Sequence, residues 1–143
     1  MKRLKKNERG AALLEAAITV PMILLICVGI FEFGRAYQTW QVLTNAAREG
    51  ARLAVIQTST DADVRSRVNN YLTNGGLTTL SDAQIVVKRA EPLTGTDKAS
   101  VIQLNYPFSF VVLNPVVKLV APSSTTGKDA ITMTSSAIMR NEM

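Results

Sequence analysis

The sequence predicts an α+β protein in which a long N-terminal helix packs on a small antiparallel sheet of about three strands. Three observations favour this fold class. An apolar run without charge, residues 16–31, is long enough with its flanks to cross a membrane as a helix. A helical spacing of small and apolar residues continues beyond it to about Ile56, and the C-terminal part contains short alternating stretches typical of strands. A helix and a sheet that each have one apolar face bury these faces against each other.

The first ten residues form a basic leader. Five of the sixteen Lys and Arg residues, and one of the eleven Asp and Glu residues, lie in the first nine positions, so only +1 of the formal charge of +5 belongs to the rest. Basic residues beside a membrane segment stay in the cytoplasm. We therefore expect a leader at 1–10, a transmembrane segment at 11–34 and an exported domain at 35–143. The nearly neutral exported part argues against nucleic acid as a partner.

The junction after the leader, Gly10-Ala11-Ala12-Leu13-Leu14-Glu15, resembles the processing site of type IV prepilins. The resemblance implies that a prepilin peptidase in the membrane cleaves between Gly10 and Ala11, and that Glu15 sets the register of the assembly helix. The physics is compatible, because a carboxylate can offset the new α-amino group of Ala11 on its own chain or on a neighbouring subunit. Alternatively, Glu15 is a helix-start acid that reaches the lipid headgroups.

A secretory signal peptide would share the basic start and the apolar run, and Gly34-Arg35-Ala36 offers a weak cleavage site after them. Two features argue against this alternative. Glu15 lies within the hydrophobic region, where a charge makes insertion costly, and the helical pattern runs through Gly34 without a break. Pro21 also lies in the apolar run, and it should kink or loosen the helix locally, which membrane helices tolerate.

The exported half of the helix begins with Glu32 and Arg35, which have the i,i+3 spacing of a surface ion pair and mark the outer interface. A buried stripe should follow on one helix face, formed by Ala36, Trp40, Leu43, Ala47, Ala51 and Ala54.

A patch of small residues overlaps this stripe, comprising Ala46, Ala47, Gly50, Ala51 and Ala54. It permits close approach of either the protein's own sheet or the helix of a neighbouring subunit. The charged residues Arg48, Glu49 and Arg52 fall mostly off the stripe, as a solvated face or as contacts to partner subunits.

Taken together, Glu15, Pro21 and the segments GIFEFGR (29–35) and NAAREGAR (45–52) resemble the signature of TadE-like proteins. These are minor pilins or pseudopilins of the tight-adherence (Flp) type IV pilus machinery. Ala16 stands where major Flp pilins typically carry tyrosine, which favours a minor component over the fibre subunit.

The resemblance implies a type IV pilin-like fold and a place in the inner membrane, with the N-terminus cytoplasmic and the domain periplasmic. It implies a role in priming, capping or supporting a pilus, with other pilins, the inner-membrane assembly platform and the prepilin peptidase as partners. It assigns helix contacts to Glu32, Gly34, Arg35, Asn45, Ala46, Arg48, Glu49, Gly50 and Arg52.

The exported domain should contain one more helix and three strands. Possible N-cap residues at 59–61, an apolar face at Val64, Val68 and Leu72, and a stop at 74–76 predict a short second helix. Strands are expected at 83–88, 100–112 and 130–139, with Pro107 marking an edge or a bulge. Residues 91–97 should form a turn and residues 114–127 an exposed loop.

Catalytic chemistry has little support in this sequence. There is no histidine, the only cysteine, Cys27, lies in the apolar run, and the carboxylates are scattered. The closest acidic pair, Asp61 and Asp63, suits the start of a helix. We therefore expect no catalytic residue, metal, cofactor or small-molecule substrate. The alternative function is an uncleaved, signal-anchored envelope protein whose periplasmic domain binds a ligand or a cell-wall component.

Overall fold

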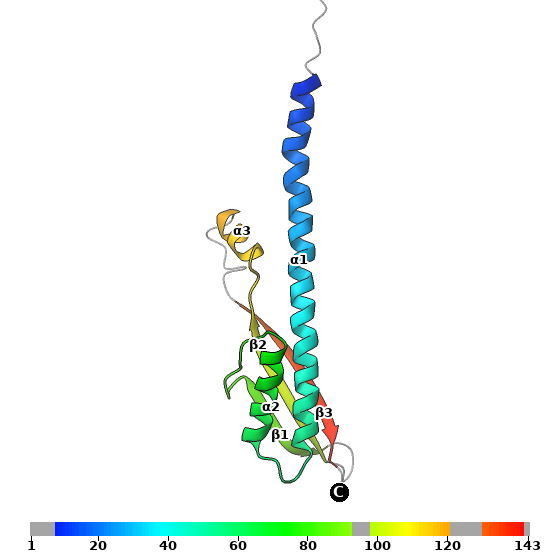
Figure 1. Cartoon of the computed structure of the whole chain (residues 1–143), viewed down its shortest axis with the longest axis vertical. Helices are drawn as coiled ribbons and strands as arrows, with labels where there is room; N and C mark the ends of the chain where they lie inside the picture. The colour runs from blue at the N-terminus through cyan, green and yellow to red at the C-terminus, as the bar shows by residue number, and fades with distance from the viewer. Residues whose placement is uncertain (1–7, 93–97, 121–129, 142–143) are drawn as a thin grey trace, which may run out of the picture.

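A computed structural model describes residues 8–92, 98–120 and 130–141. One long helix, α1 (Glu8–Ala54), extends far beyond a small domain, as Figure 1 shows. The other elements follow in the order α2 (Asp61–Asn74), β1 (Ile85–Pro92), β2 (Lys98–Phe108), α3 (Leu113–Val120) and β3 (Ile131–Arg140). The predicted fold class is confirmed, since a long N-terminal helix packs on a three-stranded antiparallel sheet.

The sheet has the order β1-β2-β3, with β2 in the centre and both pairings antiparallel. On one side of β2 the pairing reaches only from Lys98 to Leu104, opposite Ile85 in β1. Pro107, near the end of β2, therefore has a single neighbour, Thr132 in β3. This arrangement suits a residue without an N–H group, and it confirms that Pro107 marks a local edge.

The core lies between the C-terminal half of α1, the helix α2 and one face of the sheet. Most of the buried residues of α1 are small, and a Cβ built on Gly50 would lie 2.7 Å from Cγ2 of Val68 in α2. The own-chain interpretation of the small-residue patch is therefore correct. The predicted stripe was wrong at Trp40, which is 48% exposed, because the buried face passes through Thr39 and Leu43 instead.

Helix α2 begins with a capping box. The hydroxyl of Thr60 accepts a hydrogen bond from the amide of Asp63, and the carboxylate of Asp63 accepts one from the amide of Thr60. Two otherwise unpaired amides of the first turn are satisfied in this way. The hydroxyl and the amide of Thr60 also hold the pKa of Asp63 below its ordinary value. The predicted N-terminus and stop of this helix are confirmed.

Two local expectations need correction. Residues 114–120 belong to α3 rather than to an exposed loop, because Pro115 lies in the first turn of the helix, where no N–H group is needed. Glu91 and Pro92 are the end of β1 rather than the start of a turn, since they pair with Ala99 and Lys98. The rest of that turn, and residues 121–127 of the expected loop, lie outside the described residues.

Helix α1 continues without interruption through Pro21, and Figure 1 shows no sharp bend there. The kink that proline favours is therefore not formed. The helix is continuous from its exposed end to the domain.

Candidate functional site on the long helix

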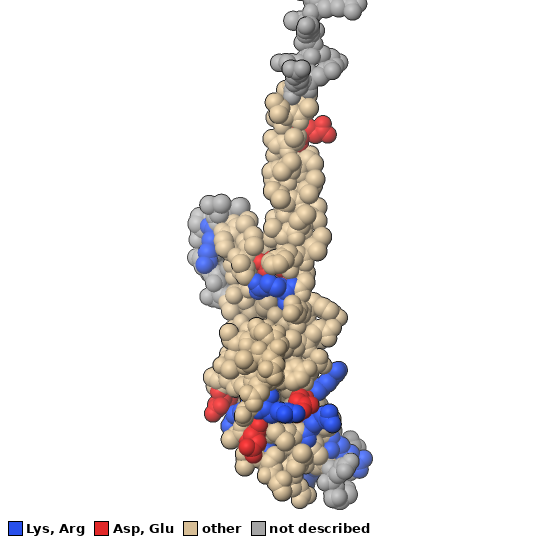
Figure 2. Space-filling view, viewed as in Figure 1, with Lys and Arg blue, Asp and Glu red and all other residues tan. Residues whose placement is uncertain are grey.

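The N-terminal half of α1 is a bare apolar surface. Residues 10–27 are all exposed, and large side chains such as Leu13 and Leu14 are 73% and 67% exposed. Figure 2 shows that this half of the molecule is almost free of charge. By length and composition, α1 is the one helix among the described residues that could cross a membrane. A water-exposed apolar surface of this extent is typical of a site for lipid or for other protein chains.

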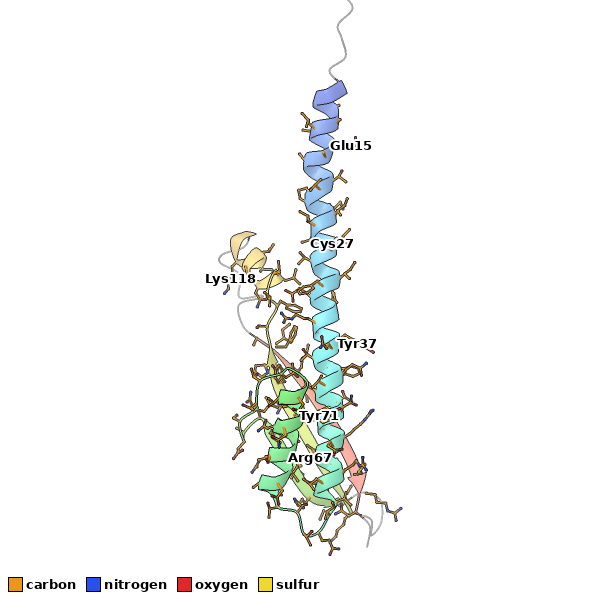
Figure 3. All side chains as sticks on the ribbon, in the orientation of Figure 1. Glu15, Cys27, Tyr37, Arg67, Tyr71 and Lys118 are labelled. Carbon is orange, nitrogen blue, oxygen red and sulfur yellow. The ribbon has the colours of Figure 1, made fainter. Side chains whose placement is uncertain are left out.

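Glu15 interrupts this surface. It is the only charged residue from Gly10 to Phe31, and its side chain is exposed on the helix. Figure 3 shows it near the N-terminal end of α1, far from the domain. A lone carboxylate in apolar surroundings is costly unless a cation lies close to it.

The predicted cleavage site lies at the same end of the helix. Gly10 is the third residue of α1, and a Cβ built on it would meet nothing within 4 Å. Ala11 is exposed as well. Both residues are therefore far from the contacts that hold the domain together.

Glu32 and Arg35 clamp α1 to the segment that follows β2. The Glu32 side chain is fully buried, and its Oε1 accepts a hydrogen bond of 2.6 Å from the amide of Val112. Arg35 donates to the carbonyl of Ser109 at 2.8 Å, and its guanidinium lies 5.0 Å from the centre of the Phe108 ring. The clamp thus fixes the end of β2 against α1.

The ion pair predicted from the i,i+3 spacing is confirmed, with 3.7 Å between Nη1 of Arg35 and Oε2 of Glu32. Its description as a surface pair was wrong, because Glu32 is covered by the domain. The partner that covers it, Val112, is distant in sequence and leaves no signal in the helical spacing. Burial of a carboxylate is tolerated here because both a cation and an amide face it.

The other motif residues divide into two groups. Ala46 and Gly50 are inside the core, whereas Gly34, Asn45, Arg48 and Arg52 are on the surface. The subunit contacts expected of these motif residues stay a prediction.

Glu49 lies at the edge of the core and accepts a 2.6 Å hydrogen bond from Arg67 in α2. This bond, opposed in part by desolvation and supported by the charges of Arg67 and Arg52, keeps the pKa of Glu49 below its ordinary value. Glu49 therefore links α1 to α2 and is not merely part of a solvated face.

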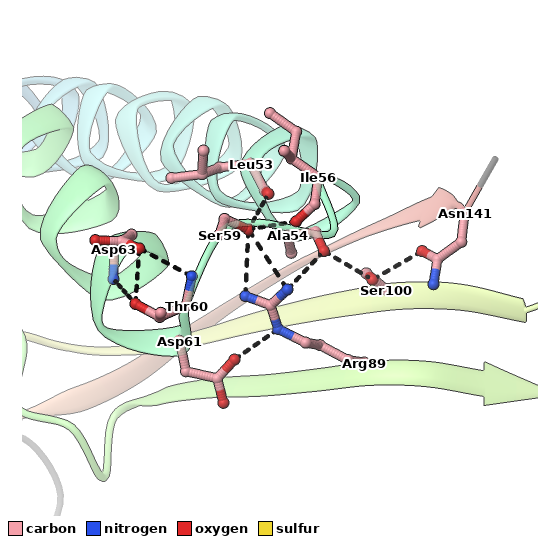
Figure 4. A network of polar contacts seen from close by, with 10 residues as sticks. All are labelled: Leu53, Ala54, Ile56, Ser59, Thr60, Asp61, Asp63, Arg89, Ser100 and Asn141. Atoms are coloured by element: carbon pink, nitrogen blue, oxygen red, sulfur yellow. Dashed lines mark hydrogen bonds and ion pairs between the residues drawn. The ribbon is translucent and has the colours of Figure 1, made fainter. Parts of the chain in front are cut away.

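Arg89 is a structural residue that the sequence did not reveal. Its guanidinium donates to Asp61 at 2.6 Å and to the last carbonyl of α1, that of Ala54, at 3.0 Å, as Figure 4 shows. A bulge in β1 between Lys88 and Glu91 accompanies it, with Ala90 at a φ of 55°. A left-handed residue in a bulge is usually glycine, which would have been a sequence signal. Because alanine occupies this position, the bulge could not be predicted. Arg89 thus ties β1 to the end of α1, where a cation is favourable.

No group of three or more His, Cys, Asp or Glu side chains that could hold a metal ion occurs among residues 8–92, 98–120 and 130–141. The polar contacts described above join elements to one another. Within the part of the chain that the structure describes, they leave one large apolar surface uncovered, that of the N-terminal half of α1.

A family model described as "TadE-like protein" matches residues 10–52, the segment that contains the motif residues named above. The resemblance to this family is therefore confirmed over that segment. Over this segment the chain is similar to proteins related to the Tad pilus. No curated protein and no solved structure matches the chain.

Proposed function

We propose that this chain is a minor pilin or pseudopilin of a tight-adherence pilus. A prepilin peptidase cleaves it after Gly10, and the apolar half of α1 then assembles with other subunits to prime, cap or support the pilus. The observation that carries this proposal is the bare apolar helix with its single carboxylate, which lies within the segment matched by the TadE-like family model.

The dimensions of α1 suit both stages of this function. Residues 11–34 exceed the about 20 residues that a helix needs to span a bilayer. Before assembly the apolar side chains would face lipid, with residues 1–10 in the cytoplasm and residues 35–143 on the periplasmic side of the inner membrane. During assembly, helices from other pilins and from the platform would replace the lipid.

Glu15 supplies the specificity that apolar packing lacks. Lipid tails and leucine side chains are equally apolar, so helix association in a membrane depends on close packing and on polar pairs. Cleavage creates an α-amino group at Ala11, and its attraction to the Glu15 carboxylate of a neighbour is strong where water is excluded. Such pairs would favour one axial stagger between adjacent helices.

Cleavage is tested by sequencing the N-terminus of the protein from membranes of a piliated host. The wild-type chain should begin at Ala11. Gly10→Leu should retain Met1 and abolish piliation, because the leader would stay in place. Gly29→Leu is the matched control, since a Cβ built on Gly29 also meets nothing within 4 Å, and it should be processed normally.

Two results would contradict the proposal. Normal pili in a Gly10→Leu strain would show that cleavage is not needed. A wild-type chain that begins at Met1 would identify an uncleaved, signal-anchored envelope protein instead.

A further inference from the structure

Helix α3 lies beside the apolar half of α1. Figure 1 shows it on the N-terminal side of the sheet, at the level of the uncovered part of the long helix. The hydrogen bond from the amide of Val112 to Glu32 fixes this level, because α3 begins at the next residue. A helix that belongs in sequence to the domain is therefore held next to the membrane-spanning segment.

The depth of α3 follows from the dimensions of a bilayer. The hydrocarbon core is about 30 Å thick and a helix rises about 1.5 Å per residue, so a core that begins near Ala11 ends close to Phe31. Glu32, the next residue, then marks the outer boundary. Since α3 extends from this boundary toward the apolar half, it lies at the level of lipid rather than of the aqueous periplasm.

The side chains of α3 suit this place. Leu113, Val116 and Val117 share one helix face at i, i+3 and i+4, whereas Asn114 and Lys118 share another at i and i+4. Val116 is 38% exposed, and Val111, just before the helix, is 60% exposed. Figure 3 shows Lys118 on the side of α3 that faces away from α1. An apolar face combined with a peripheral lysine is typical of helices that lie in a lipid interface.

We propose that α3 is a second membrane contact of this chain, lying in the outer interface of the bilayer. Val111 and Val116 contact lipid acyl chains, and Lys118 reaches the phosphate groups of the lipids. The inference rests on the proposed function in that it needs α1 to span the membrane with the domain outside.

An eight-residue helix buries too little apolar surface to bind a membrane strongly by itself. In this chain, however, α1 and the Glu32 clamp already hold α3 at the bilayer surface. Insertion is then an intramolecular step, which succeeds with a much smaller contact than binding from solution would need.

Fluorescence quenching by lipid-borne spin labels tests the proposal. The full chain carrying Cys27→Ser and Val116→Cys is labelled with an environment-sensitive fluorophore and reconstituted in vesicles of phosphatidylethanolamine and phosphatidylglycerol. The emission should shift to the blue and lose intensity when the vesicles contain lipids with a nitroxide close to the headgroup. Val111→Cys repeats the measurement outside α3, in case one of the two variants folds poorly.

Two control positions provide a label that should contact lipid and a label that should not. A label on the native Cys27, exposed on the apolar half of α1 and about 6 Å inside the outer boundary at Phe31, should be quenched by lipids with a nitroxide in the upper part of the acyl chain. A label introduced by Ser136→Cys, on the exposed side of β3, should be quenched by neither lipid.

Labels at 111 and 116 that are quenched no more than the label at 136 would overturn the proposal while leaving α1 as the anchor. Labels shielded from water but untouched by lipid quenchers, with disulfide cross-links between two chains in the unlabelled variants, would assign the surface to a second copy and also overturn it. Absence of quenching at Cys27 would show that α1 does not span the membrane, and it would overturn both this inference and the proposed function.

Discussion

The two halves of α1 are both rich in small and apolar residues, but they meet different partners. Residues 36–54 pack against α2 and the sheet through alanines and Gly50, which allow elements of the same chain to approach closely. Residues 10–31 present large side chains such as Leu13 and Ile18, which no described part of the chain covers. The size of the apolar side chains thus separates the intramolecular interface from a surface that needs lipid or other subunits.

Glu15→Ala should have the largest effect, and only between chains. Loss of one partner of a buried charge pair costs about 3–5 kcal/mol, so recruitment into pilus complexes should fall about a hundredfold or more. Membrane insertion and domain stability should not change. Co-purification with pilus components measures recruitment, and Asp82→Asn, at an 81% exposed carboxylate of the domain, is the control. Undiminished recruitment of Glu15→Ala would contradict the registration role.

Gly50→Leu should have the largest effect within the chain. Because a Cβ at this position would already lie 2.7 Å from Val68, the larger side chain should destabilise the domain by about 3 kcal/mol or more. Gly29→Leu, in the apolar half, where a Cβ meets nothing within 4 Å, should leave stability unchanged. Urea unfolding of the full chain in detergent, followed by fluorescence of the single tryptophan, Trp40, measures both. Equal stabilities would refute the distinction between the two halves.

Glu32→Ala should loosen the junction between the halves. It leaves the amide of Val112 without its acceptor, at a cost of about 1–3 kcal/mol. Glu32→Gln retains an acceptor and should cost less. Hydrogen exchange should accelerate at Val112 and in α3 but not in α2. If both variants match the wild type, the clamp does not hold the end of β2.

The ion pair between Glu49 and Arg67 should give the smallest effect, a loss of domain stability in acid. The pKa of Glu49 is lower in the folded protein than its ordinary value near 4.5, so the ion pair with Arg67 stabilises the fold above that pH. This stabilisation is lost as the pH falls through the lowered folded pKa. For such a surface pair the loss should stay below about 1 kcal/mol.

Glu49→Gln and Arg67→Met remove the same pair from opposite sides. In both variants the free energy of unfolding should therefore fall less steeply as the pH is lowered, by similar amounts. Urea unfolding from pH 3 to 6, roughly the range in which carboxylates titrate, measures this dependence. If neither variant changes the loss of unfolding free energy in acid, the ion pair between Glu49 and Arg67 is not the cause of that loss.

Local signals predicted much of this structure. The Thr60 and Asp63 cap, the stop at Gly75 and the three strands follow from short-range chemistry that is visible in the sequence. The membrane-length helix and its lone Glu15 were equally visible, because an absence of charge over many residues is a strong pattern.

Long-range contacts account for what the sequence did not predict. Burial of Glu32 depends on Val112, eighty positions away, and the role of Arg89 depends on Ala54 and Asp61. Helix α3 was missed because proline can mark either a loop or the first turn of a helix, and Pro115 was interpreted as a loop signal. None of these contacts produces a periodic pattern in the sequence.

The unbroken course of α1 through Pro21 has a mechanical consequence. A helix of 47 residues is about 70 Å long, and without a hinge it acts as a lever. A tilt of about 10° at its apolar end would swing the domain end sideways by roughly 12 Å. In the proposed assembly, the angle that neighbouring helices impose on the apolar half would therefore decide where the domain stands and which surfaces it can reach.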